Sequence, residues 1–266
     1  MKWEKDYFNL DMKERVVVIT GGAKGIGKEM AKAYLMKGAK VIIIDISYNE
    51  SSIREEMPCS SEMLDFYKLD ITNEEQVNEL VQSIYEKNKF ITHLINNAGI
   101  YATDAIESIS NKNLENTFNV NLFGALNMIK AVLPIMKKQN YGFIINMSSV
   151  AAFHNGINAG PYNMSKSAVV SMTKTLAKET RDYDIKVNAI CPGLVKTPMY
   201  TEMLEKRAKH YGIALDEFEK NMMDGCEQKR LIDPREIASL ALFLGSDMAN
   251  GISGTAIVVS GNGLVF

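Results

Sequence analysis

A chain of 266 residues is long enough to bury a large core, and no linker or composition shift divides it, so we expect one domain over residues 1–266. With 30 basic and 32 acidic side chains and a net charge of −2, it offers no electrostatic basis for binding nucleic acid or an anionic membrane. Segment 1–15 is heavily charged and the apolar runs elsewhere are only as long as strands, so we expect neither a signal peptide nor a membrane-spanning helix. The three cysteines have unrelated spacings, which is typical of a protein in the reducing cytoplasm.

The first predicted elements form a βαβ unit joined by a glycine-rich turn. The apolar run Val16–Ile19 is typical of a strand buried on both faces of a parallel sheet. Apolar residues then recur at helical spacing as far as Gly38, and a second buried strand, Val41–Ile44, is followed by Asp45. The segment Thr20–Gly27 therefore lies where dinucleotide-binding proteins hold a pyrophosphate.

The glycines of this turn, Gly21, Gly25 and Gly27, would let the backbone approach a pyrophosphate at the N-terminus of the helix. Asp45 could accept hydrogen bonds from both hydroxyls of an adenosine ribose, and it would repel a 2′-phosphate. Lys24 favours NADP instead, since a cation in the turn could bind the 2′-phosphate. Because one exposed lysine is weaker evidence than a carboxylate aimed at the ribose, we expect NAD rather than NADP.

Later elements continue the alternation of helices and strands. The segment Thr72–Glu75 predicts a capping box that opens a helix to about Asn88, and 114–136 predicts a long helix carrying Asn121 midway. Apolar runs predict further strands at 94–95, 143–145, 187–190 and 256–259.

Tyr162 and Lys166 lie four residues apart, soon after Ser149. On a helix this spacing places both side chains on one face. An ammonium beside a phenol favours the phenolate and lowers a pKa that is ordinarily about 10, so Tyr162 could act as a general acid or base. The pair alone also fits an ordinary solvated helix face; the glycine turn earlier in the chain favours the catalytic interpretation.

These motifs together resemble the short-chain dehydrogenase/reductase family over essentially all of residues 12–266. The residues that carry the resemblance are Gly21, Gly25, Gly27, Asp45, Asp70, Asn96, Asn97, Ala98, Gly99, Asn121, Ser149, Tyr162, Lys166, Pro192, Gly193 and Thr197. The resemblance implies an α/β fold: a single-domain, Rossmann-like, doubly wound parallel sheet of about seven strands with helices on both faces. It also implies an oxidoreductase that transfers hydride between a nicotinamide cofactor and a secondary alcohol or ketone.

The resemblance implies four catalytic residues and a set of cofactor contacts. Ser149 would bind the substrate carbonyl, Lys166 the nicotinamide ribose, and Asn121 would anchor a water chain that carries the proton to solvent behind Lys166. Tyr162 would transfer the proton, whereas Ser148 is expected to be a structural hydroxyl. The implied cofactor-binding residues are Gly21, Lys24, Gly25, Ile26, Gly27, Asp45, Asp70, Ile71, Asn97, Ala98, Gly99, Tyr162, Lys166, Pro192, Gly193, Val195 and Thr197.

Family members fold a segment corresponding to residues 198–228 over the substrate as a lid. This segment is rich in methionine, which suits an adaptable apolar cover and also fits plain packing. With Ser149, the expected substrate contacts are Ala151, His154, Met199 and Tyr200. The other two histidines, His93 and His210, have no metal-ligand spacing with His154, so no metal site is expected.

Several functions remain open within this resemblance. The long lid and the ending 263–266 are similar to acyloin reductases and sugar-alcohol dehydrogenases, which favours a small polyol, sugar acid or acyloin. The Ala151–Ala152 pair, and Ser260 where most members have aspartate, are instead similar to bacterial hydroxysteroid dehydrogenases. A 3-oxoacyl-carrier reductase is a further alternative, which would be expected to prefer NADP and to have a basic patch for docking its carrier. A non-catalytic nucleotide-sensing regulator is another, but such a protein would be expected to lack Tyr162 or Lys166, and this chain has both. The family also implies a homotetramer, a dimer of dimers.

Overall fold

One parallel sheet organises the protein. The computed structural model describes residues 10–47, 50–58, 61–224 and 228–261, so the ending 263–266 and part of the expected lid lie outside it. Within these residues seven strands pair in parallel in the order β3-β2-β1-β4-β5-β6-β7. Their bounds are β1 Val16–Thr20, β2 Lys40–Asp45, β3 Leu64–Lys68, β4 His93–Asn96, β5 Gly142–Met147, β6 Ile185–Pro192 and β7 Ala256–Val259. This is the doubly wound parallel sheet that was expected, and its strand order reverses between β1 and β4, where such sheets bind ligands.

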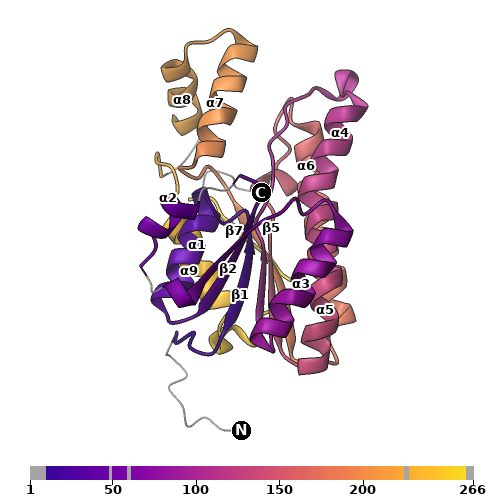
Figure 1. The fold of residues 1–266 in the computed structure, drawn as a ribbon. Helices are drawn as coiled ribbons and strands as arrows, with labels where there is room; N and C mark the ends of the chain where they lie inside the picture. The colour runs from indigo at the N-terminus through magenta and orange to yellow at the C-terminus, as the bar shows by residue number, and fades with distance from the viewer. Residues whose placement is uncertain (1–9, 48–49, 59–60, 225–227, 262–266) are drawn as a thin grey trace.

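Helices cover both faces of the sheet (Figure 1). α1 and α9 pack together on one face, and α3, α5 and α6 lie on the other. The α7–α8 pair stands beyond one end of the sheet. The bounds are α1 Gly25–Met36, α2 Glu50–Glu55, α3 Glu74–Asn88, α4 Asn111–Phe118, α5 Ala125–Gln139, α6 Gly160–Glu179, α7 Pro198–Tyr211, α8 Leu215–Asp224 and α9 Pro234–Leu244.

The central strands read as continuous apolar runs because helices bury them on both sides. β1 is buried throughout, and alternate residues join different cores: Val17 and Ile19 face α1 and α9, whereas Val16 and Val18 face α3 and α5. The edge strand β3 was not expected from the sequence. Its segment Leu64–Lys68 contains Asp65 and Lys68 and is only partly buried, so it lacks the apolar run that identifies the inner strands.

Two helix boundaries differ from the sequence expectations. The side chain of Asn73 caps α3 by accepting a hydrogen bond from the backbone N–H of Gln76 at 3.1 Å, so the capping box predicted at Thr72 is wrong. The hydroxyl of Thr72 instead donates to Asp70 Oδ1 at 2.9 Å. The long helix expected over 114–136 contains a π-helical segment, Asn119–Gly124, between α4 and α5. A π-helical turn frequently marks a functional site, and this one carries Asn121.

The helical stretch 111–139 is, by length and composition, apolar enough to cross a membrane, contrary to the expectation of no such helix. Its mean hydropathy is 1.3 in the best window, of which 33% is buried inside the protein. Core helices of soluble proteins pass the same test, and α5 contributes Met128, Ile129 and Val132 to the core. A second apolar surface on this stretch, including Phe123 and Leu126, remains exposed.

Candidate active site

The turn between β1 and α1 needs glycine at three positions, for conformation at Gly21 and Gly25 and for space at Gly21 and Gly27. The φ angles of Gly21 and Gly25 are +64° and +57°, in the region that glycine adopts most easily. A Cβ atom on Gly27 would lie 2.2 Å from the carbonyl oxygen of Gly21. The N-cap residue Lys24 makes no side-chain capping hydrogen bond, and the first turn of α1 carries no acidic residue. The N–H groups of this turn therefore suit an anion such as a pyrophosphate.

Asp45 lies beside this turn, as the sequence analysis expected. Its carboxylate accepts hydrogen bonds from the backbone N–H of Ala23 at 3.0 Å and of Ser47 at 2.9 Å. The side chain is thereby held at the end of β2, next to the turn that would take the pyrophosphate. Lys24 is exposed on the same turn. These positions fit an adenine dinucleotide, with Asp45 able to accept from ribose hydroxyls.

The segment after β4 braces the glycine turn. Asn97 Nδ2 donates to the carbonyl oxygens of Thr20 and Gly21 at 3.0 and 2.8 Å, and the Thr20 hydroxyl accepts from the N–H of Ala98 at 3.1 Å. The side-chain amide nitrogen of Asn97 therefore stabilises the conformation of the glycine turn. A Cβ atom on Gly21 would lie 2.8 Å from Ala98 Cα, so the two segments touch.

Asp70 and Ile71, both expected at the cofactor, lie after β3 in different environments. Asp70 is exposed, and its Oδ1 accepts from the N–H and hydroxyl of Thr72. The side chain of Ile71 is 6% exposed and packs into the core against Gly124. Its side chain is therefore a core group, because the π-helical segment passes directly over it.

The four expected catalytic residues come from three parts of the fold. Tyr162 and Lys166 stand in the first two turns of α6, with Lys166 Nζ 5.7 Å from the centre of the Tyr162 ring. Nζ is buried and donates to the carbonyl oxygen of Met147 at 2.8 Å. Ser149 follows β5, with its hydroxyl accepting from the N–H of Ala151 at 3.1 Å and donating to the Pro192 carbonyl at 3.5 Å.

Asn121 is buried in the π-helical segment and lies close to Lys166. Its amide exchanges hydrogen bonds with the backbone of Ile100 at 2.8 and 3.0 Å and donates to the hydroxyl of Ser165 at 3.0 Å. A Cβ atom on Gly99 would be 3.2 Å from Asn121 Oδ1 and 3.4 Å from Lys166 Nζ. Asn121 thus holds the segment after β4 against α6, and this bracing role was not foreseen.

Burial acts on both members of the Tyr162–Lys166 pair. It raises the pKa of Tyr162 to about 12, opposed by the Ser149 hydroxyl, and lowers the pKa of Lys166 to about 8. The expectation that Lys166 brings the pKa of Tyr162 below its ordinary value is therefore wrong for the protein alone. The ammonium is itself desolvated and directed at the Met147 carbonyl, so desolvation of the phenol dominates.

The expected structural role of Ser148 is confirmed. Its hydroxyl is buried and donates to the backbone carbonyl of Lys166 at 2.8 Å. This bond ties the end of β5 to α6, which positions both Ser149 and the Tyr162–Lys166 pair.

The segment after β6 reaches the glycine turn from the other side. The Thr197 hydroxyl caps α7 by accepting from the N–H of Tyr200 at 3.2 Å, and its methyl group would be 3.4 Å from a Cβ on Gly25. Val195 is buried and pairs with Ile232. Gly193 packs against Ser260, whose Cα would be 3.1 Å from an added Cβ, so Ser260 adjoins a segment expected to bind the cofactor.

The expected substrate residues divide into exposed and buried ones. His154 and Met199 are exposed, and Ala151 is partly buried beside Ser149. Tyr200 is 7% exposed, lies in the apolar interior of the α7–α8 pair and donates its hydroxyl to Glu219 at 3.1 Å. The ring of Tyr200 is thus turned toward α8, and its assignment as a substrate contact stays a prediction.

Tyr101 is a site residue that sequence analysis missed. Its ring packs edge-on against Tyr162, with ring centres 5.0 Å apart and an interplanar angle of 63°. It also packs against the apolar cluster of the α7–α8 pair. Its place two residues after Gly99 was the available signal, since residues after a strand at the switch point face the ligand.

A family model for short chain dehydrogenases matches residues 15–208. The chain belongs to this family. It is 36% identical over 94% of its length to a 3-oxoacyl-[acyl-carrier-protein] reductase, FabG, of Thermotoga maritima, of which it covers 98%. It is 33% identical over 95% of its length to a diacetyl reductase [(S)-acetoin forming] of Staphylococcus epidermidis, covering 99%. A solved structure of ElxO with NADP bound superposes with a TM-score of 0.82 at 30% identity, with 93% of this chain and 97% of that one covered.

The short chain dehydrogenase is thus an oxidoreductase that acts on CH–OH groups with a nicotinamide cofactor. The cofactor supplies or accepts the hydride, and the protein's residues orient the reactants and move the proton. The Tyr162 phenol, protonated at neutral pH, is suited to donate a proton to a carbonyl oxygen as negative charge develops there. The Ser149 hydroxyl, close to Tyr162, is placed to donate to the same oxygen.

The two directions of reaction should depend differently on pH. Alcohol oxidation needs the phenolate of Tyr162, so its rate should rise by close to tenfold per pH unit below the pKa, whereas ketone reduction needs the phenol and should stay level. The Lys166 ammonium favours the phenolate, so Lys166→Met should move the oxidation profile to higher pH. The difference in oxidation rate between the wild type and Lys166→Met should be largest below a pH of about 8, where Lys166 carries its charge. Initial rates in both directions from about pH 6 to about pH 10 measure this; an unchanged profile in Lys166→Met would remove the electrostatic role of the lysine.

Proposed function

We propose that this enzyme interconverts a secondary alcohol and a ketone with NAD(H), acting on a small polyol, sugar acid or acyloin. The observation that carries the proposal is the convergence of Ser149, Tyr162 and Lys166 beside a glycine turn flanked by Asp45. The likeness to a diacetyl reductase supports the acyloin class.

The preference for NAD rests on Asp45. Its buried carboxylate lies against the glycine turn, where it would repel the 2′-phosphate of NADP. Lys24 is exposed to solvent, which makes it the weaker determinant of the choice between NAD and NADP. A neighbour of this fold was solved with NADP, so the carboxylate is what argues for a different preference here.

Asp45→Ala should shift the ratio of kcat/KM values toward NADP by on the order of 1 to 3 kcal/mol, the scale of losing hydrogen bonds to a charged group. The substitution removes the repulsion and the ribose contacts together. Steady-state rates with both dinucleotides measure the ratio, with Lys24→Ala as the comparison variant. A wild-type enzyme that already uses NADP better than NAD would contradict the assignment and point to Lys24.

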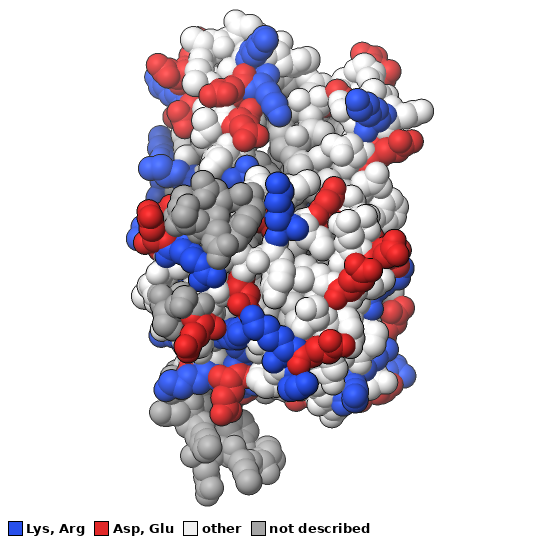
Figure 2. All heavy atoms as spheres, viewed as in Figure 1, with Lys and Arg blue, Asp and Glu red and all other residues white. Residues whose placement is uncertain are grey.

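A 3-oxoacyl-carrier reductase is the second candidate, because a reductase of that name is 36% identical over nearly the whole chain. Near-neutral net charge argues against it, since an acidic carrier needs a basic surface. On the face shown in Figure 2, basic and acidic side chains are interspersed. A hydroxysteroid dehydrogenase remains the third candidate, on the Ala151–Ala152 pair and Ser260.

One experiment separates these candidates. The wild-type enzyme is assayed with NAD and NADP on acetoin, sorbitol, gluconate, a bile acid and a 3-oxoacyl thioester. We expect the small hydroxylated compounds with NAD to give the highest kcat/KM. Turnover of the thioester with NADP alone would favour the second candidate, and selective oxidation of the bile acid the third.

We also propose a cytoplasmic homotetramer. The exposed apolar side chains Phe123, Leu126 and Met164 lie on the α4–α5 stretch and on α6, elements that pack together on one side of the sheet. Such a surface suits a second copy of the chain. A reducing compartment suits the buried free thiol of Cys191.

A further inference from the structure

One charged residue stands in an otherwise apolar stripe of the lid helix α7. Tyr200, Met203, Leu204 and Ala208 recur at spacings of three and four and are buried against α8 and its surroundings. Arg207 continues the same stripe, three residues after Leu204, and is partly buried. An apolar residue would be expected there if the stripe served packing alone.

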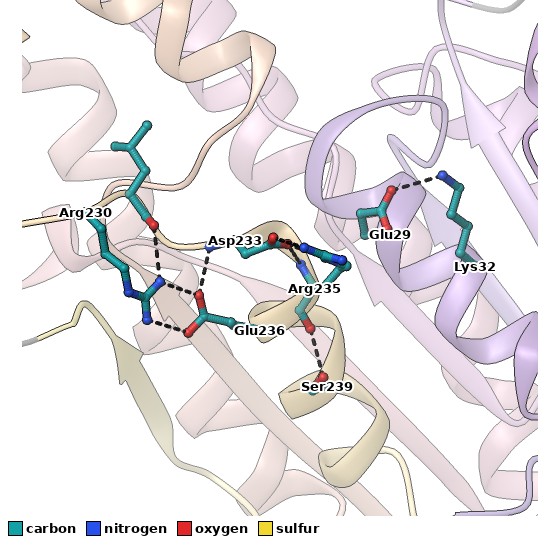
Figure 3. A network of polar contacts seen from close by, with 8 residues as sticks. Glu29, Lys32, Arg230, Asp233, Arg235, Glu236 and Ser239 are labelled. Carbon is teal, nitrogen blue, oxygen red and sulfur yellow. Dashed lines mark hydrogen bonds and ion pairs between the residues drawn. The ribbon is translucent and has the colours of Figure 1, made fainter. Parts of the chain in front are cut away.

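The guanidinium of Arg207 has no charged partner within the described part of the chain. Its central carbon lies 5.5 Å from the centre of the Phe218 ring, and its Nε is buried without a hydrogen-bond acceptor. Two arginines that follow the lid in the sequence, Arg230 and Arg235, are by contrast paired, as Figure 3 shows. Arg230 binds Glu236 through two contacts of 2.6 and 3.0 Å, and Arg235 binds Asp233.

Arg207 packs on Phe218, in the apolar cluster of the α7–α8 pair that Tyr101 joins to Tyr162. Tyr101 packs both on the ring of Tyr162 and on the apolar cluster of the α7–α8 pair. Burial raises the pKa of Tyr101, and the charge of Arg207 opposes that rise. Tyr101 therefore connects the ring of Tyr162 to the cluster in which Arg207 packs on Phe218.

A partly buried arginine without a carboxylate partner is costly unless an anion satisfies it. The planar guanidinium matches the two oxygens of a carboxylate. We propose that Arg207 binds a carboxylate of the substrate, so that this enzyme interconverts a hydroxy acid and an oxo acid. This inference rests on the proposed function, within which it selects the acid-bearing class of alcohols. Arg207 acts in binding and in choice of substrate, while proton transfer remains with Tyr162.

Paired substrates and paired variants test the assignment. Gluconate and sorbitol share a six-carbon polyol chain and differ in the carboxylate, and 3-hydroxybutyrate and 2-butanol form a shorter pair. Arg207→Met keeps an apolar stem against Phe218 and removes the charge. Lys206→Met removes one charge from the exposed neighbouring position of the same helix and is the matched control. Arg207→Lys keeps the charge and loses the two-pronged geometry.

We expect the wild type to prefer the acid of each pair. Arg207→Met should raise KM for the acids by roughly 10- to 100-fold, the scale of hydrogen bonds to a charged group, and leave kcat within about threefold, because a carboxylate remote from the reacting carbon is bound equally in ground and transition states. KM for the neutral partners should stay within about threefold. Arg207→Lys should give an intermediate KM, and Lys206→Met should match the wild type.

The outcomes distinguish a failure of the carboxylate assignment from a failure of the proposed dehydrogenase function. Equal effects of Arg207→Met on acids and neutral alcohols, or a wild-type preference for the neutral member of each pair, would overturn the carboxylate assignment and leave the dehydrogenase intact. Turnover of no panel compound would count against the proposed function. In that case, calorimetric titration of 3-hydroxybutyrate into NAD-loaded protein still judges Arg207: binding to the wild type that Arg207→Met abolishes supports it, and binding unaffected by the substitution refutes it.

Discussion

Tyr162→Phe should lower the turnover number by at least ~10²-fold, the lower end for a positioned general acid or base, with little change in NAD affinity. The substitution keeps the ring that packs against Tyr101 and removes the hydroxyl that would exchange the proton. Stopped-flow or steady-state rates give kcat, and fluorescence titration with NADH gives the dissociation constant.

Tyr183→Phe is the matched control for that experiment. Tyr183 is exposed, with its ring under Lys137, in the turn that follows the end of α6 opposite to Tyr162. Its loss of a hydroxyl should leave kcat unchanged. Tight NADH binding by a wild type that turns over no substrate, with Tyr162→Phe indistinguishable from it, would instead indicate a nucleotide-sensing protein.

Gly27→Ala should weaken dinucleotide binding at least ~10-fold and lower the free energy of unfolding by about 1 to 3 kcal/mol, the usual cost of overpacking. The new methyl group would lie 2.2 Å from the Gly21 carbonyl oxygen and 2.5 Å from Asn97 Nδ2. Neither can yield without opening the hydrogen bond between them, which shapes the turn. Calorimetry with NAD and chemical denaturation measure the two effects.

Gly251→Ala provides the comparison, because nothing lies within 4 Å of a Cβ added at Gly251 and its φ needs no glycine. That variant should bind NAD as the wild type does. If Gly27→Ala also binds NAD normally, the glycine turn is not the pyrophosphate site.

Much of the fold could be predicted because its signals are local. The strands β1 and β2 are buried on both faces, so they read as uninterrupted apolar runs next to a glycine turn. The prediction that Tyr162 and Lys166 lie on one face of a helix is likewise confirmed, since the geometry of α6 alone places residues four apart on the same side. β3 escaped prediction because an edge strand that is only partly buried shows no such run.

Protonation and side-chain partners could not be predicted in the same way. The sequence predicted that Lys166 would lower the pKa of Tyr162, yet burial raises it to about 12, because desolvation depends on how many elements crowd the site. The hydrogen bonds by which the amide of Asn121 bridges Ile100 and Ser165 were not foreseen, and its catalytic role stays a prediction. Ile71 and Tyr200 stood at positions expected to meet ligands, and the burial of both side chains in apolar clusters could not be foreseen.

By itself the sequence determined the buried inner strands, the glycine turn, the acid at the end of β2 and the spacing of Tyr162 and Lys166, since each is set by residues within a few positions of one another. Only the tertiary structure decided that Tyr101 stands between Tyr162 and the lid, and that Arg207 enters the lid's apolar interior without an acidic partner among the described residues. These residues are far apart in the chain, and their contact depends on how the segment after β4 meets α6 and how α7 folds back toward it.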